Sequence, residues 1–302
     1  MSTADQHLAT RRSAGLFDFS FMGLYEFFGV DALARMQSRD LSHLAPGQIA
    51  YSLLLNDDGS VFNDATVWNR DGERWWLFTG RPGDFGWIRA RADARDRSGE
   101  HAILALQGPL SGRILARLAG EEVLRNLQYF RFVQANQMSV ARLGYSGELG
   151  YELVVSTDEA SRLRQSLRDA GRPEGLSECS FEAADSLRIE SGYVLFDREI
   201  DGRANPRELG LEKLVSNRRG FEISRRLVGL EITNEPGSGE HLSAQVTSEC
   251  FSPTLGRRIA LGFATPDARA GDIVCLDDGR IARVAPLPFY DRDKRRPRIA
   301  PL

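Results

Sequence analysis

The sequence contains few of the residues that build metal centres, disulfide frameworks and membrane spans. Its 302 residues include three cysteines and four histidines, and neither type shows a CxxC pair or the spacing of metal ligands. No stretch approaches the roughly 20 consecutive apolar residues of a transmembrane helix. The polar N-terminal segment also lacks the apolar centre of a secretory signal. We therefore expect no metal site, no disulfide framework, no membrane contact and a reducing, cytoplasmic location.

Common catalytic and nucleic-acid-binding patterns are missing too. There is no GxSxG, no Walker A sequence and no dinucleotide-binding glycine fingerprint. The formal net charge of -3 does not favour a nucleic-acid surface. Each histidine is predicted to lie on the surface or in a loop, at His7, His43, His101 and His241. Small molecules remain as the expected partners.

The composition that is present indicates a globular protein of two or three subdomains. Hydrophobic residues make up 42% of the chain and the mean hydropathy is -0.33. The first dozen residues look frayed. Helices are predicted over residues 29–44, 82–94, 157–171 and 180–192. Strands are predicted at 15–20, 49–55, 61–68 and 74–80, with a strand, turn and helix over 101–120.

The last part of the chain changes character. From about residue 221, short apolar runs alternate with turn residues, which predicts a small antiparallel β-barrel. We therefore predict an α+β body over residues 1–224 and a barrel domain over 225–302. The basic tail at 291–302 is expected on the surface. Since no heptad pattern is visible, we expect a monomer or a weak homo-oligomer.

Two polar side chains lie in a hairpin of apolar strands. Asp64 interrupts the second strand, and Tyr51 lies in the first. Asn56-Asp57-Asp58-Gly59 joins the two, since Asp and Gly tolerate positive φ. Asp64 could face solvent on an edge strand and Tyr51 could be core, so pattern alone leaves both interpretations open.

A third polar residue interrupts the run RLGYSGELGYELVV (142–155), which is predicted to form one strand. Glu152 precedes Leu153-Val154-Val155, where a lone buried carboxylate is costly. Tyr145 lies seven residues earlier, on the opposite face of a regular strand unless the glycines insert a bulge. A salt bridge from Glu152 to an arginine is one interpretation. The other is a planar heterocycle, such as a pterin, that presents an amine beside a ring N–H to the carboxylate, between tyrosine walls.

GYSGELGYEL (144–153) resembles the GYTGExGYE signature of the glycine cleavage T-protein, which heads a family of folate-dependent aminomethyltransferases. Further resemblance covers nearly the whole chain, at residues 15–20, 29–33, 47–67, 105–109, 185–193, 252–263 and 288–290. The resemblance implies two interwoven α+β subdomains and a small antiparallel barrel around a central hole that binds tetrahydrofolate.

The resemblance also implies roles for individual residues. Tyr51 and Tyr145 would line the pterin pocket, and Glu152 would hold the pterin amine and ring N–H. Asp64 would lie beside the folate nitrogens that accept the one-carbon unit, as the catalytic residue. Alanine, Ala184, replaces an arginine that contacts folate in the family, and Arg188 one turn later is assigned as a compensating cofactor ligand.

Other segments indicate which member of the family the chain resembles. NPRELGLEKLV (205–215) is similar to a segment of folate-dependent demethylases, as are FND (62–64) and RWW (74–76). We therefore expect a demethylase that moves a methyl group from a small O-, S- or N-methylated substrate to tetrahydrofolate. An aminomethyltransferase is one alternative. A non-catalytic folate-binding protein is another, since residues 212–232 lack part of the family's usual insertion. A role in iron–sulfur assembly is disfavoured because residues 194–210 contain no cysteine.

Overall fold

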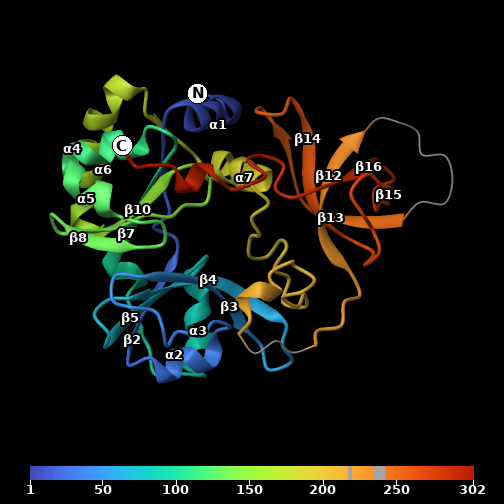
Figure 1. The fold of residues 1–302 in the computed structure, drawn as a ribbon, viewed down its shortest axis with the longest axis horizontal. Helices are drawn as coiled ribbons and strands as arrows, with labels where there is room; N and C mark the ends of the chain where they lie inside the picture. The colour runs from blue at the N-terminus through green and yellow to red at the C-terminus, as the bar shows by residue number, and fades with distance from the viewer. Residues whose placement is uncertain (217–219, 234–241) are drawn as a thin grey trace.

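The computed structural model describes residues 1–216, 220–233 and 242–302. This part of the chain forms two β-sheets and a closed β-barrel, with helices on the outside of the sheets (Figure 1). The chain enters the first sheet, builds the second, returns to the first and ends with the barrel. The predicted α+β class, with two interwoven subdomains and a C-terminal barrel, is confirmed.

The first sheet packs three helices against its outer face. Its strands lie in the spatial order β11 (Ser177–Glu178), β1 (Gly15–Asp18), β7 (His101–Gln107), β10 (Gly150–Ser156), β9 (Met138–Ala141) and β8 (Phe132–Ala135). Its outer face packs against α4 (Ser111–Ala119), α5 (Glu121–Asn126) and α6 (Ala160–Gly171). Leu104, Tyr151 and Leu153 belong to this outer core, so their neighbours in sequence point to the other face of the sheet.

The second sheet is antiparallel and repeats this arrangement. Its strands lie in the order β3 (Ile49–Leu55), β4 (Val61–Asn69), β5 (Arg74–Thr79), β2 (Gly23–Phe28) and β6 (Arg95–Asp96). Its outer face packs with α2 (Asp31–Met36) and α3 (Phe85–Arg89). Two strands joined by a turn were predicted over residues 49–55 and 61–68, and the hairpin of β3 and β4 is confirmed.

The inner faces of the two sheets share one apolar cluster. Ile49 and Trp68 from the second sheet belong to it with Ala105, Ala141 and Val154 from the first. Because side chains alternate along a strand, every second residue of β10 and β4 points toward this shared region. Glu152 on β10 and Asp64 on β4 therefore both point into the region between the two sheets.

Helix α7 (Phe181–Glu190) joins the first sheet to the barrel (Figure 1). Ser180 caps its N-terminus by accepting the backbone N–H of Ala183. The barrel strands follow the cyclic order β12 (Arg226–Thr233), β14 (Arg257–Ala264), β13 (Leu242–Ser252), β15 (Ile273–Leu276) and β16 (Ile281–Ala285). The predicted barrel is confirmed, but β13 and β15 pair in parallel, so it is not wholly antiparallel.

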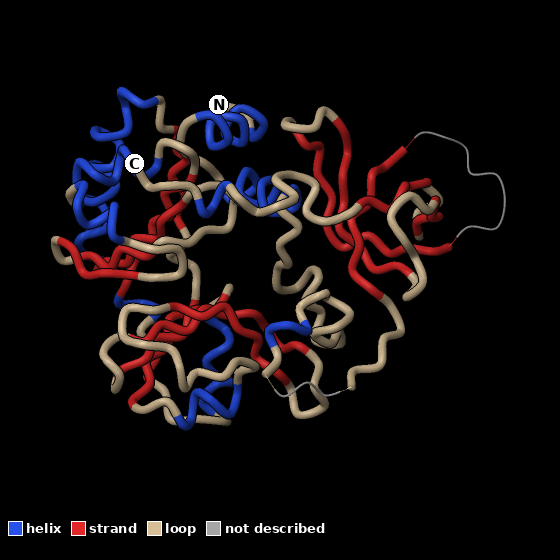
Figure 2. The backbone as a smooth tube through the Cα atoms, viewed as in Figure 1, coloured by secondary structure: helices blue, strands red, loops and turns tan. Residues whose placement is uncertain are grey.

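The N-terminal end of the chain departs from expectation. The first residues are not frayed, because α1 (Thr3–Arg12) begins with a capping box of Ser2 and Asp5. His7 on this helix is fully buried, with Nε2 3.0 Å from Glu190 Oε1, so its prediction as a surface histidine is wrong. The C-terminal tail crosses back to the first sheet (Figure 2), where Arg142 donates to the carbonyl of Ile299.

Two predicted helices are shorter than expected. The segment 29–44 is helical only at α2, and the segment 82–94 only at α3 and a preceding 3₁₀ turn. No helix in the described ranges is long and apolar enough to cross a lipid bilayer.

Candidate active site

The β3–β4 hairpin places Tyr51 and Asp64 on its inner face. Leu53 lies directly opposite Asp64 in the register, so Tyr51 is a diagonal neighbour on the same face. The Tyr51 hydroxyl donates to Oδ2 of Asp64 over 2.8 Å. Neither the edge-strand interpretation of Asp64 nor the core interpretation of Tyr51 accounts for this contact between two half-buried polar groups.

Burial governs the protonation of this pair. It raises the pKa of Asp64 to about 6, against the lowering effect of the Tyr51 hydrogen bond. Burial, followed by the nearby Asp64 charge, raises the pKa of Tyr51 well above its ordinary value. Asp64 is therefore an ionised carboxylate above about pH 6, held by a phenol that stays protonated.

Residues 142–149 form a loop between β9 and β10, so the prediction of a single strand over 142–155 is wrong. The side chain of Gln107 fills the space beside Gly144 and Gly150, and a Cβ on either glycine would overlap it. Ser146 Oγ donates to Gln107 Oε1 over 2.8 Å. Gly147 turns the loop at a φ of 79°, which glycine adopts at low cost. Gly144 and Gly150 thus allow the loop to pack closely around the side chain of Gln107.

The two glutamates of the motif have opposite surroundings. Glu148 is buried and accepts from Arg11 over 3.1 Å and from the Tyr290 hydroxyl over 2.8 Å. Glu152 is 5% exposed, yet no hydrogen bond or ion pair reaches its carboxylate within the described residues. Glu148 therefore ties the loop to both chain ends, whereas Glu152 carries unused acceptor capacity.

Burial alone raises the pKa of Glu152 to about 7. Its neighbours across the sheet are Ala105 on β7 and Ala141 on β9, which are too small to fill the space beside a glutamate. The salt-bridge interpretation of Glu152 finds no arginine partner in the described part of the chain. A ligand with paired N–H donors would satisfy this carboxylate.

Tyr145 lies on the 142–149 loop and packs against the shared inner cluster. Its hydroxyl donates to the carbonyl of Val194, and its ring stacks on Tyr193 with centroids 5.9 Å apart. Tyr193 follows the end of α7, where Gly192 adopts a φ of 65°. Tyr193 was not predicted as a site residue. The signal available in the sequence was its position directly after Ser191-Gly192, where the predicted helix ends.

Arg188 on α7 is fully buried among protein acceptors. Its Nε donates to Asp185 over 2.7 Å, its Nη1 to Glu199 over 2.7 Å and its Nη2 to Ser248 over 2.6 Å. These bonds join α7 to the linker and the barrel. Its assignment as a cofactor ligand stays a prediction, and a direct contact would require it to give up one of these partners. Ala184, one turn earlier, lies in the shared inner cluster.

A second set of polar residues supports Asp64 from the other side of β4 and was missed in the sequence. Asn63 is fully buried, accepts the Asp64 backbone N–H and donates to Asp84 over 2.6 Å. Arg81 pairs with Asp84 over 2.7 Å and with Asp197 over 2.6 Å. This chain of bonds fixes β4 next to Asp64 and links it to the segment after α7.

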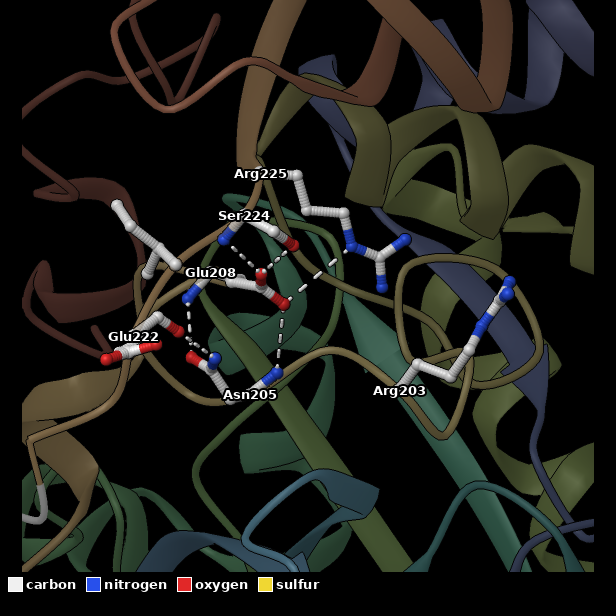
Figure 3. A pocket seen from close by; sticks show the side chains of 7 residues that line it. Arg203, Asn205, Glu208, Glu222, Ser224 and Arg225 are labelled. Carbon is white, nitrogen blue, oxygen red and sulfur yellow. Dashed lines mark hydrogen bonds and ion pairs between the residues drawn. The ribbon is translucent and has the colours of Figure 1, made fainter.

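A polar cavity of about 530 Å³ lies on the linker to the barrel (Figure 3). Its central group, Glu208, accepts from the backbone of Asn205 and from both donors of Ser224. Asn205 also caps the turn by accepting from the backbone N–H of Arg207. The demethylase-like segment NPRELGL (205–211) therefore folds onto the start of the barrel, and its polar groups satisfy one another. Residues 217–219 of the shortened 212–232 segment lie outside the described residues.

The four inner-face groups fit a folate ring in their chemistry. Glu152 offers an unpaired acceptor, Tyr51 and Tyr145 offer half-buried aromatic surface, and Asp64 offers an oriented carboxylate. The described residues contain no cluster of His, Cys, Asp and Glu that could hold a metal ion. The arrangement is suited to binding a ring and to stabilising positive charge.

Comparison with known proteins agrees over the whole chain. The family described as GCVT N-terminal domain matches residues 1–219, and the glycine cleavage T-protein C-terminal barrel domain matches residues 225–291. An aminomethyltransferase of Symbiobacterium thermophilum is 33% identical over 341 residues, covering 98% of this chain and 91% of that protein. One from Shouchella clausii is 33% identical over 330 residues, covering 96% and 90%.

A solved structure gives the same result for the fold. The crystal structure of glycine cleavage system aminomethyltransferase T from Bartonella henselae has a TM-score of 0.84 and 25% identity to this chain. The match covers 96% of this chain and 90% of that one. These relatives are named aminomethyltransferases, which favours that alternative over the expected demethylase.

Proposed function

The chain belongs to the glycine cleavage T-protein family of tetrahydrofolate-dependent enzymes, and we propose that it transfers the carbon of an aminomethyl group to tetrahydrofolate. The observation that carries this proposal is the buried, unpartnered carboxylate of Glu152 on the sheet face opposite the Tyr51–Asp64 pair. A ring bound between these faces would present its N–H donors to Glu152 and its accepting nitrogens toward Asp64.

Tetrahydrofolate supplies two nucleophilic nitrogens that accept the one-carbon unit. Glu152 binds and orients the ring, and Tyr51 and Tyr145 supply aromatic surface beside it. Asp64, ionised above about pH 6, stabilises positive charge that develops on the donor's aminomethyl group as its bond to the leaving heteroatom breaks. Tyr51 holds that carboxylate in position, and Asn63 holds the strand behind it.

The donor class is the finer part of the proposal. The aminomethyltransferase names of the relatives support a donor that carries an aminomethyl group. The demethylase-like segment 205–211 gives weaker support for a methylated donor, since its polar groups are used within the linker. The cytoplasmic location and the monomeric or weakly oligomeric state stay predictions.

The oxidation state of the product separates the three functions. An aminomethyl donor with tetrahydrofolate gives 5,10-methylenetetrahydrofolate and ammonia, whereas a methylated donor gives 5-methyltetrahydrofolate. We would incubate the protein anaerobically with tetrahydrofolate and each donor class, and identify the folate product by mass spectrometry. Asp64→Asn serves as the matched control. Formation of the methyl product alone would replace the proposal with the demethylase, and folate binding without either product would indicate a non-catalytic binding protein.

A further inference from the structure

Arg81, just after the end of β5, joins two carboxylates from different parts of the chain. Its Nε donates to Asp84 Oδ1 over 2.7 Å, and its Nη1 donates to Asp197 Oδ1 over 2.6 Å. Its backbone carbonyl accepts from the hydroxyls of Thr79 and Tyr25, over 2.9 and 3.2 Å. The planar guanidinium, with donors in fixed directions, therefore starts from an anchored backbone.

The buried partner, Asp84, connects Arg81 to the candidate catalytic carboxylate. Its other oxygen accepts from the side chain of Asn63 over 2.6 Å, and Asn63 Oδ1 accepts the backbone N–H of Asp64 over 2.9 Å. Because neighbours along a strand point to opposite faces, Asn63 lies behind β4 while Asp64 faces the region between the sheets. Arg81 thus acts on Asp64 through the backbone of the strand.

The exposed partner, Asp197, belongs to the segment that follows α7 (193–200). Its neighbour Phe196 fills the space left by Gly80, where a Cβ would overlap the ring. This contact and the ion pair from Arg81 fasten the same part of the segment to the end of β5.

The beginning of the same segment holds Tyr145. The carbonyl of Val194 accepts from the Tyr145 hydroxyl, and the Tyr193 ring stacks on Tyr145 with centroids 5.9 Å apart. The segment therefore contacts one wall of the candidate site near its start and Arg81 a few residues later. The positions of Tyr145 and Asp64 are coupled through Arg81.

Arg81 also offsets a charge that acts on Asp64. Burial raises the pKa of Asp64 to about 6, and the charge of Asp84 contributes to the rise. The guanidinium bonded to Asp84 opposes that contribution, so removing it should raise the pKa of Asp64 further. Substitution at Arg81 leaves in place the other groups that act on Asp64, which are Tyr51 on β3, Tyr145 on the 142–149 loop and Arg188 on α7.

We propose that Arg81 is a positioning residue for one-carbon transfer, which holds Asp64 and Tyr145 at a fixed spacing through its bonds to Asp84 and Asp197. Arg81 acts through these partners and not by contact with the ring. A displacement of about 1 Å in a group that stabilises charge lowers the rate even when the ligand still binds. This inference rests on the proposed function, because it assigns Asp64 a role in the transfer.

The test uses Arg81→Gln, which removes the cation, and Arg81→Lys, which keeps the charge but lacks the planar fork. Arg74→Gln is the matched control, because Arg74 also pairs over 2.7 Å with an aspartate three residues away. It lies at the start of β5, whereas the other end of this strand pairs with the residue after Asp64.

Three quantities would be measured for the full-length protein and each variant. Carbon-13 NMR follows the titration of the Asp64 carboxyl, with Asp64→Asn to assign its signal. Anaerobic calorimetry gives the dissociation constant of tetrahydrofolate, and rapid quenching with an aminomethyl donor gives the single-turnover rate at pH 8. Thermal melting verifies that each variant is folded.

In Arg81→Gln, the titration of Asp64 should move upward by about half a pH unit from its wild-type value. The single-turnover rate at pH 8, where this carboxyl is ionised in every variant, should fall about tenfold, and the affinity for tetrahydrofolate should change about twofold or less. Arg81→Lys should restore the titration but only part of the rate. Arg74→Gln should match the wild type in all three quantities.

Two results would overturn the inference and leave the proposed function standing. One is an Asp64 titration in Arg81→Gln that matches the wild type, and the other is a rate at pH 8 equal to that of Arg74→Gln. If Arg81→Gln does not fold, a wild-type rate in Arg81→Lys overturns the inference instead. If the wild-type protein forms no folate product from an aminomethyl donor, the proposed function fails, and the inference fails with it.

Discussion

The hydroxyl of Tyr51 lies 2.8 Å from Oδ2 of Asp64, and the two residues are diagonal neighbours on one hairpin. The register of β3 against β4 sets this relationship, so the carboxylate is oriented before any ligand arrives. Preorganised charge of this kind stabilises a transition state without the cost of reorganisation. Substitution of either residue should therefore change the rate of one-carbon transfer or its pH dependence.

Asp64→Asn should lower the rate of one-carbon transfer and leave tetrahydrofolate binding nearly intact. The amide keeps the size of the side chain but loses the negative charge, and losses of about 10²–10³-fold are typical for groups that stabilise charge in this way. Single-turnover rates and calorimetric affinities measure the two effects separately. An equal loss in both would place Asp64 in ring binding rather than in charge stabilisation.

Tyr51→Phe should shift the acidic limb of the rate–pH profile upward. The tyrosine hydrogen bond lowers the pKa of Asp64, which burial holds at about 6, so removing the hydroxyl raises that pKa further. If the ionised carboxylate is the active form, activity is half-maximal near pH 6 in the wild type and at a higher pH in the variant. Asp64→Asn should show no such limb, and an unshifted limb in Tyr51→Phe would assign it to another group.

The sequence predicted the strands of the site better than the loops. Two apolar runs and the turn residues between them placed Tyr51 and Asp64 correctly on paired strands, because strand and turn signals are local in sequence. Tyr145 and Glu152 were expected on one strand with a bulge. Instead, Tyr145 lies on a loop that is folded around Gln107, a residue distant in sequence. A contact of that kind leaves no periodic signal.

Long-range ion pairs account for other differences between the predicted and the observed structure. Helix α1 is polar along much of its length, so periodicity gave no reason to expect it. His7 and Arg11 both bind Glu190 on α7, about 180 residues away. Long-range bonds also hold Arg188, whose guanidinium is directed at Asp185, Glu199 and Ser248 from three different elements. Its contact with the cofactor stays a prediction.

Folate affinity should depend on pH through Glu152. Burial raises the pKa of its carboxyl to about 7, and two N–H donors of a bound ring require the ionised form. Below pH 7 the affinity should therefore fall by up to about tenfold per pH unit, and near pH 6 binding should release about one proton. Calorimetry in buffers of different ionisation enthalpy measures that proton. Identical release by Glu152→Gln would show that another group titrates.

The two glutamates of the GYSGELGYE motif should respond to substitution in opposite directions, whatever the protein transfers. The folded-state pKa of Glu152, about 7, lies above the ordinary value of 4.5 for a glutamate. Between these values the folded state binds more protons than the unfolded state, so this residue's contribution to stability falls as pH rises. At pH 8 the ionised carboxylate costs up to about 3 kcal/mol. Glu152→Gln should raise the free energy of unfolding by much of that amount at pH 8, and by much less near pH 4.5.

Glu148→Gln is the matched comparison four residues away. It removes the charge that Arg11 and Tyr290 contact and leaves Arg11 with Glu190 as its remaining carboxylate partner. Breaking a buried pair on one side typically costs about 3 kcal/mol or more, and the loss should be seen across the neutral range. Urea unfolding of both variants at two pH values measures the contrast. Destabilisation by both substitutions at pH 8 would mean that the Glu152 carboxylate has a partner within the folded protein, and its availability to a ligand would then be lost.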